Sequence, residues 1–132
     1  YLSAPEEDLY VFGNENDLFR AFENLLSNAI RHAESRIDVS ITKEGKRVGI
    51  LVSDDGPGIS EDIIDKVFDR FVQGEGGKHG IGLALVHAIV SSHDGFVSAS
   101  NKKNPENGAI ITVQLPLYSP EKHSKKTDRI KK

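Results

Sequence analysis

The polar residues Asn24, Asn28 and Arg31 recur at intervals of four and three within the segment ENLLSNAIRHAE. On a helix, at about 100° per residue, this spacing places the three side chains on one stripe about 60° wide. Asn is a mediocre helix former, so two of them one turn apart are an unusual choice for a face that only contacts water. An amide oxygen is also a suitable ligand for Mg²⁺, which keeps waters and phosphate oxygens as its other ligands. The stripe is therefore either a solvated helix face or one side of a magnesium site.

A second polar group is the segment DDGPGIS, from Asp54 to Ser60, which directly follows a predicted strand. Gly-Pro-Gly is strong turn chemistry, and a plain surface turn explains it. A carboxylate buried at the end of a strand would instead need a donor, and the amino group of adenine is one. Gly56 and Gly58 would then let a flat ring approach the backbone closely. The segment thus allows two interpretations, a turn or a base-binding site.

The third candidate is a cluster of five glycines between Gly74 and Gly82. Gly80 and Gly82 flank the start of an apolar helix, where free N–H groups and the helix dipole attract phosphate. A flexible linker would look similar. The chain lacks the third glycine of the dinucleotide motif and has no GKS or GKT sequence, which disfavours both familiar nucleotide-binding folds.

These groups depend on elements that the hydrophobic pattern predicts. A long amphipathic helix should begin at a cap on Asn14, with an acid, Asp17, three residues later. Its apolar face, opposite the polar stripe, comprises residues at spacings of three and four: Leu18, Phe19, Phe22, Leu25, Leu26, Ala29, Ile30 and Ala33. A second helix, from Ile81 to His93, is apolar nearly all round and should be deeply buried. A short helical piece is expected over residues 63–71.

Strands are predicted at Leu9–Phe12, in two alternating runs around KEGK, and in two runs around NPENG. The first pair comprises Ile37-Val39-Ile41 and Val48-Ile50-Val52, and the second Phe96–Ser100 and Ala109–Leu115. The expected fold class is α/β (α+β), a two-layer sandwich with a mixed, largely antiparallel sheet and about three helices on one face. Residues 119–132 form a basic tail that we expect to be disordered.

Composition narrows the class further. The 132 residues suffice for one domain, and the net charge of −3 argues against a general nucleic-acid or membrane-surface binder. The chain has no cysteine, which excludes disulfide and thiol chemistry. Its longest apolar stretch is far shorter than the roughly 20 residues of a membrane span. Because the first residue is Tyr1 rather than Met, we expect the chain to be a piece of a longer protein.

Four segments in order resemble the boxes of sensor histidine kinases. ENLLSNAIRHAE looks like the N box, DDGPGIS the G1 box, VFDRFVQ the F box and HGIGLALV the G2 box. HDG and GAIITVQLP resemble the closing segments of that family. The resemblance covers Leu9 to Leu117 and implies the Bergerat fold of the catalytic ATP-binding domain, shared with gyrase, Hsp90 and MutL. It predicts a kinase catalytic domain over residues 1–118, with an ATP lid at about 72–80.

The resemblance also implies roles for individual residues. Asn28 would be the Mg²⁺ ligand with Asn24 nearby, and Arg31 would contact the distal phosphates. Asp54 would accept the adenine amino group, and Asp55 replaces the usual Asn without changing that role. Ala109 stands where some relatives use Thr to hold a water, and it lacks that hydroxyl. The nucleotide-binding set would comprise His32, Asp54, Gly56, Gly58, Ile59, Phe68, Phe71, Lys78, Gly80, Ile81, Gly82 and Leu83.

By this resemblance the domain would bind ATP-Mg²⁺ and transfer the γ-phosphoryl group to a histidine of a separate dimerisation domain, for signalling to a response regulator. None of the chain's five histidines has the sequence context of that acceptor. Two alternatives remain, a serine kinase of the anti-sigma-factor type and an ATP-binding module without transfer activity. The fragment is expected to be cytoplasmic and monomeric, within a full-length protein that is dimeric and anchored in the membrane.

Overall fold

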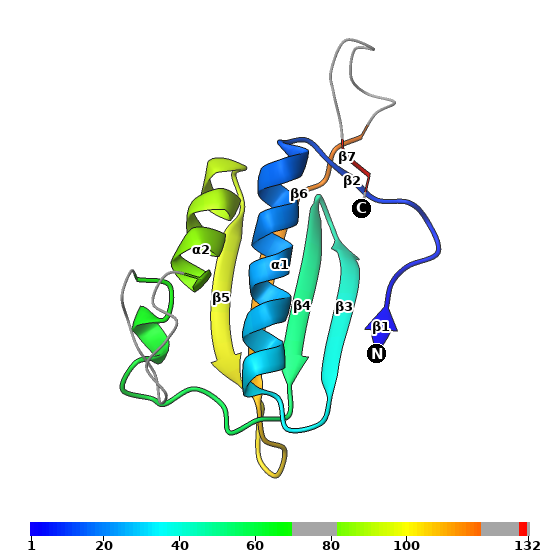
Figure 1. Ribbon diagram of the computed structural model, residues 1–132. Coiled ribbons are helices and arrows are strands. Elements are labelled where there is room, and N and C mark those ends of the chain that lie inside the picture. Colours follow the sequence, from blue (N-terminus) through cyan, green and yellow to red (C-terminus); the bar gives the residue numbers. More distant parts are fainter. Residues whose placement is uncertain (70–81, 120–129, 132) are drawn as a thin grey trace.

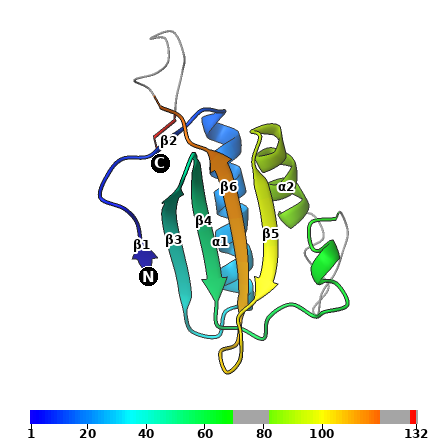
Figure 2. The same ribbon diagram turned by 180° about the vertical axis from the view of Figure 1, so that it is seen from behind.

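A computed structural model describes residues 1–69 and 82–119 and the backbone of residues 130–131. Five strands form the main sheet in the order β1-β3-β4-β6-β5, parallel between β1 and β3 and antiparallel elsewhere. These strands are β1 (Leu2–Ser3), β3 (Ile37–Glu44), β4 (Arg47–Asp54), β5 (Phe96–Asn101) and β6 (Ala109–Pro116). Two helices, α1 (Glu15–His32) and α2 (Gly82–Ser92), cover one face of the sheet (Figures 1 and 2). The predicted two-layer α/β class is confirmed.

The predicted hairpins are present with the expected register. In the first, Val39 pairs with Val52 and Ile41 with Ile50, so these side chains share the face toward the helices. The strands β5 and β6 form the second hairpin around the predicted turn. The helical content differs slightly from the expectation of about three helices. Within the described residues, the third is only a one-turn 3-10 helix, η1 (Ile64–Lys66).

Helix α1 begins as predicted. The Asn14 side chain accepts a hydrogen bond of 2.9 Å from the Asp17 N–H, which satisfies one of the free donors of the first turn. The predicted apolar face is partly wrong, since Phe19, Leu26 and Ile30 are exposed. The helix lies over the centre of the sheet and leaves β3 to one side (Figure 1). Neighbouring elements therefore cover only part of its apolar face. The buried residues are Leu18, Ala21, Leu25 and Ala29.

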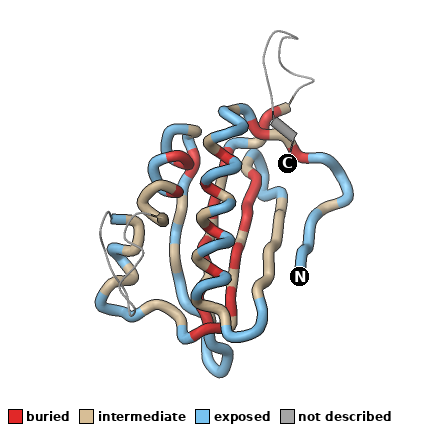
Figure 3. Tube along the Cα trace, in the orientation of Figure 1, coloured by how far each residue is buried: buried red, intermediate tan, exposed pale blue. Residues whose placement is uncertain are grey.

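Helix α2 is less buried than its composition predicts. Its buried residues are Val86, Ile89 and Val90, whereas His87 and Ala88 are exposed. The expectation of deep burial is wrong because α2 lies at the edge of the helical layer, beside β5 (Figure 3). An element at an edge has neighbours on fewer sides, whatever its hydrophobicity.

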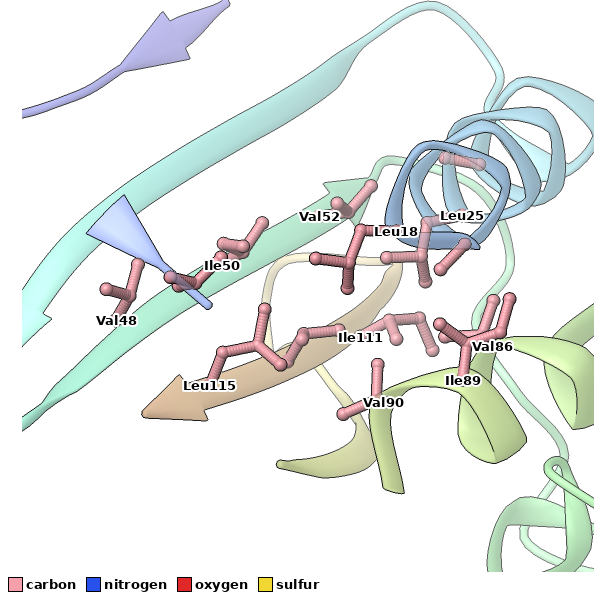
Figure 4. Packing of buried hydrophobic residues seen from close by; sticks show 14 of the residues in the cluster. Leu18, Leu25, Val48, Ile50, Val52, Val86, Ile89, Val90, Ile111 and Leu115 are labelled. Carbon is pink, nitrogen blue, oxygen red and sulfur yellow. The ribbon is translucent and has the colours of Figure 1, made fainter. Parts of the chain in front are cut away.

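The core lies between α1, α2 and the sheet. Figure 4 shows Leu18 and Leu25 of α1 and Val86 and Ile89 of α2 gathered in one cluster with Val52 of β4 and Ile111 of β6. Full burial of one such side chain contributes about 1.5–3 kcal/mol. This contact fixes α1 relative to α2 and to β4, the three elements that carry the candidate site residues.

Two short segments near the two ends of the chain pair with each other. Strand β2 (Tyr10–Val11) confirms the strand predicted at Leu9–Phe12 and pairs with β7 (Ile130–Lys131) in antiparallel orientation. These two residues of the predicted tail form a short strand on the open edge of β2, which offers them backbone hydrogen bonds. Residues 120–129 and 132 lie outside the described part. Among the described residues, no helix combines the length and apolar character needed to cross a membrane.

Candidate nucleotide-binding site

The candidate residues gather at one end of the domain. The C-terminal ends of α1 and β4 lie there beside the connection from β5 to β6 (Figure 1). Asp54 is the last residue of β4 and Ala109 the first of β6. The antiparallel order of these neighbouring strands thus brings the G1 segment next to a part of the chain that lies 55 residues later.

Asp54 is the buried acid that the sequence predicts at the end of a strand, with 4% of its surface exposed. Its Oδ1 accepts hydrogen bonds from the backbone N–H of Gly56, at 2.9 Å, and of Ala109, at 3.3 Å. No donor among the described residues is bonded to Oδ2. The protein therefore orients this carboxylate through one oxygen and leaves the other for a further donor. A buried carboxylate needs such donors to offset its loss of hydration.

Glycines near Asp54 let backbone segments approach one another. A Cβ on Gly56 would collide with the carbonyl oxygen of His32, and one on Gly108 with the carbonyl of Asp54. Gly108 also has φ of +129°, in the region that favours glycine. The sequence interpretation assigned the space at Gly56 to an approaching ring. The structure adds a packing reason for this glycine, because the carbonyl oxygen of His32 at the end of α1 lies where a Cβ would be.

Asn101, the last residue of β5, holds the next part of the G1 segment. Its Oδ1 accepts the N–H of Ile59 at 2.8 Å, and its Nδ2 donates to the carbonyl of Ile59, also at 2.8 Å. A Cβ on Gly58, where φ is +87°, would lie 2.8 Å from Asn101 Oδ1. The sequence analysis missed Asn101, because nothing in its local sequence signals a partner 42 residues away.

Asp55 points to a different part of the chain from Asp54. Its Oδ1 accepts the backbone N–H groups of Glu34, Ser35 and Arg36 at 2.8, 3.0 and 3.1 Å. Its Oδ2 accepts the Ser35 hydroxyl at 2.7 Å. The Ser35 hydrogen bonds, followed by those from the other two amides, hold the pKa of Asp55 well below its usual range. Asp55 thereby ties the G1 segment to the connection that follows α1.

The polar stripe of α1 is accessible. Asn24, Asn28 and His32 are half-buried, and Arg31 is exposed. The side-chain amides of Asn24 and Asn28 make no hydrogen bond with another described residue. They have oxygen atoms to offer to a cation.

The amide oxygens of Asn24 and Asn28 suit a Mg²⁺ ion that takes most of its ligands from elsewhere than the protein. Residues 1–69 and 82–119 contain no cluster of three His, Asp or Glu side chains that could hold a metal. A cation here would thus be bound by few protein oxygens and by phosphate oxygens and water, as Mg²⁺ usually is.

At the N-terminus of α2, a Cβ on Gly82 would meet no described atom within 4 Å. The N–H groups of a helix start lack partners within the helix and can bind phosphate.

The F-box residue Phe68 contacts helix α2. Its ring stacks against that of His87, with centroids 6.0 Å apart and planes at 30°, and it packs against the core cluster. Leu83, which the resemblance also places at the nucleotide, is half-buried and packs on the same cluster. The predicted residues Phe71, Lys78, Gly80 and Ile81, and the predicted lid at 72–80, lie outside the described residues.

His93 has a structural role away from the candidate site, where α2 ends and α1 begins. Its Nε2 accepts the N–H of Asn14 at 3.0 Å, and its Nδ1 lies 2.7 Å from the carbonyl oxygen of Ile89. These contacts require a neutral ring with the proton on Nδ1. His93 thus connects the end of α2 to the start of α1.

A family model described as histidine kinase-, DNA gyrase B-, and HSP90-like ATPase matches residues 13–119. The signal transduction histidine-protein kinase BaeS of Escherichia coli is 36% identical over 123 residues, which cover 87% of this chain and 26% of BaeS. The sensor histidine kinase component HK1 of Mycobacterium tuberculosis is 35% identical over 125 residues, covering 92% of this chain and 73% of HK1.

Solved structures agree with this similarity. The mycobacterial sensor histidine kinase MprB has a TM-score of 0.78 at 25% identity, covering 88% of this chain and 81% of that one. The catalytic domain of histidine kinase ThkA has a TM-score of 0.77 at 26% identity, covering 92% and 80%. This chain spans only about a quarter of several relatives, including BaeS.

Proposed function

Because the chain belongs to the family of histidine kinase-, DNA gyrase B- and HSP90-like ATPases, we propose that it is the catalytic domain of a sensor histidine kinase. It binds ATP with Mg²⁺ and transfers the γ-phosphoryl group to a histidine of a dimerisation domain. A response regulator then receives that phosphoryl group. The curated relatives that share 33–36% identity with the chain are named as histidine kinases, which supports this assignment within the family.

The geometry of Asp54 is the observation that carries the proposal. Its Oδ1 is satisfied by two backbone N–H groups, so the carboxylate cannot turn freely, and Oδ2 accepts the amino group of adenine. Guanine carries a carbonyl oxygen at that position and would face a carboxylate oxygen. Asp54 therefore selects adenine over guanine. Ile59 packs beside the base and His32 borders it, as the resemblance implies.

The remaining residues act on the phosphates. Asn28, with Asn24 beside it, supplies amide oxygens to Mg²⁺, which neutralises phosphate charge and orients the triphosphate when it is bound. Arg31 is exposed and permanently charged, and donates to the distal phosphates. The N–H groups at Gly82 and Leu83 face the phosphates at the start of α2.

Transfer breaks the bond between the γ-phosphorus and the bridging oxygen and forms a bond from that phosphorus to an imidazole nitrogen, while ADP leaves. Such a reaction relies mainly on positioning and on stabilising charge. The chain's residues therefore contribute by holding the triphosphate, and the acceptor histidine comes from the partner domain. In the membrane-anchored full-length protein, this domain would work on the cytoplasmic side.

The proposal is tested by mixing the chain with a histidine-bearing dimerisation domain and ATP labelled at the γ-phosphate. We expect acid-labile, base-stable label on the partner domain, dependent on Mg²⁺. Acid-stable phosphoserine on an anti-anti-sigma protein would identify the serine kinase instead. ATP binding without label on either protein would mean a binding module without transfer activity.

A further inference from the structure

The segment that would receive adenine is a loop, and a loop binds a rigid base well only if its backbone is held in place. From Gly56 to Ile59 the chain belongs to no helix or strand, and Gly58 has φ of +87°. Hydrogen bonds within a regular element therefore cannot fix this segment. Side chains from other parts of the molecule have to do so.

We propose that Asn101 is a positioning residue for the adenine site. Its carboxamide forms two hydrogen bonds of 2.8 Å with one residue, Ile59, accepting from the N–H and donating to the carbonyl. These two hydrogen bonds resemble the pair that two facing residues exchange in a β-sheet. They fix the orientation of the Ile59 peptide groups. The inference rests on the proposed function, since Ile59 matters for catalysis only if a base packs against it.

The anchoring point suits this role. Asn101 ends β5, and its backbone pairs with Ala109, whose N–H orients Asp54. Asn101 and Ala109 lie opposite each other in the sheet. The side chain of Asn101 thus holds Ile59, and the backbone N–H of Ala109 holds Asp54. Asn101 does not itself contact the base, and it acts through Ile59, which would do so.

Only an amide of this length satisfies both groups of Ile59. Ala removes both hydrogen bonds. Asp keeps the acceptor for the N–H, but its second carboxylate oxygen faces the carbonyl oxygen of Ile59. When that introduced carboxyl is protonated, it again offers one acceptor and one donor. The Asn101→Asp variant should therefore recover as the pH falls, a response that mere loss of folding would not produce.

The test measures ADP affinity by calorimetry, at a temperature where all variants are folded. We expect Asn101→Ala to weaken ADP binding about tenfold, as loss of two ordinary hydrogen bonds would. Relative to the wild type at each pH, Asn101→Asp should be weak at pH 7 and close to wild type at pH 4. The matched controls are Asn104→Ala, an exposed Asn of the same hairpin, and Val97→Ala, which destabilises the same strand away from the loop.

Hydrogen exchange gives a readout without ligand. The Ile59 amide should exchange faster in Asn101→Ala and be unchanged in Asn104→Ala. Wild-type ADP affinity in Asn101→Ala, with Asp54→Ala weakened, would overturn this inference and leave the proposed function intact. If the wild-type chain bound no adenine nucleotide, the proposed function would fail, and this inference with it.

Discussion

The backbone N–H of Ala109 lies 3.3 Å from Oδ1 of Asp54, so the first residue of β6 orients the acid at the end of β4. The sequence analysis considered Ala109 only for the hydroxyl that it lacks. Its contribution is instead the backbone, which any residue other than Pro supplies. Because Gly56 binds the same oxygen, the direction of Oδ2 follows from the sheet and the turn together.

Exchange of Asp54 for Asn should change nucleotide specificity. In Asp54→Asn, the single amide oxygen would stay with the N–H groups of Gly56 and Ala109, leaving an NH₂ group toward the base. We expect ATP affinity to fall about 10- to 100-fold, since hydrogen bonds to charged groups contribute about 1.5–3 kcal/mol. The ratio of ATP to GTP affinity should fall, because the amide can donate to the guanine carbonyl. Calorimetry with both nucleotides measures this ratio. Asp62→Asn, at an exposed position, is the control, and an unchanged ratio in a folded Asp54→Asn would refute the base assignment.

Removal of the Asn28 amide should abolish the effect of Mg²⁺. In Asn28→Ala, we expect ATP affinity in Mg²⁺ to fall at least about tenfold, toward the value measured in EDTA, because a metal ligand is lost. Calorimetry with and without Mg²⁺ gives the comparison. Asn16→Ala makes the same substitution on an exposed part of the same helix and should behave as wild type. Equal Mg²⁺ dependence in both variants would exclude Asn28 as a ligand.

Two glycines should respond differently to alanine. Gly82→Ala has room for its methyl group, so the free energy of unfolding should stay the same or rise. ATP binding should nevertheless weaken more than adenosine binding, since the phosphates approach this backbone. Gly56→Ala should instead destabilise the fold, because its methyl group meets the His32 carbonyl. Urea unfolding and calorimetry of both variants check this contrast, and equal losses of stability would contradict it.

Asp55 should make stability depend on acid pH. Its folded-state pKa is lowered by hydrogen bonds from Ser35, Arg36 and Glu34, so its contribution is fully present above its unfolded pKa of about 4. The contribution is lost as the pH falls from there toward the lower folded pKa. The stability difference between the wild type and Asp55→Ala should therefore shrink between pH 5 and pH 3. Urea unfolding at each pH measures it, with Asp62→Asn as the control. A difference independent of pH would rule out the carboxylate as its source.

Local features of the sequence determined much of this protein. The Asn14 cap with Asp17, the alternating hairpins and the break in regular structure after Asp54 depend on neighbours within a few residues, and the structure contains all three. The ordered boxes likewise predicted the family correctly. Such signals are readable because helix and strand periodicity repeats within a short stretch of chain.

Only the tertiary structure decided which atoms complete the site. The hydrogen bond from Ala109 to Asp54 spans 55 residues, and that between Ile59 and Asn101 spans 42. No local pattern encodes such a partner, because it depends on the order of the strands in the sheet. The same reason explains the exposed face of α1 and the half-exposed α2, since hydrophobicity favours burial but the neighbouring elements decide how much of a helix they cover.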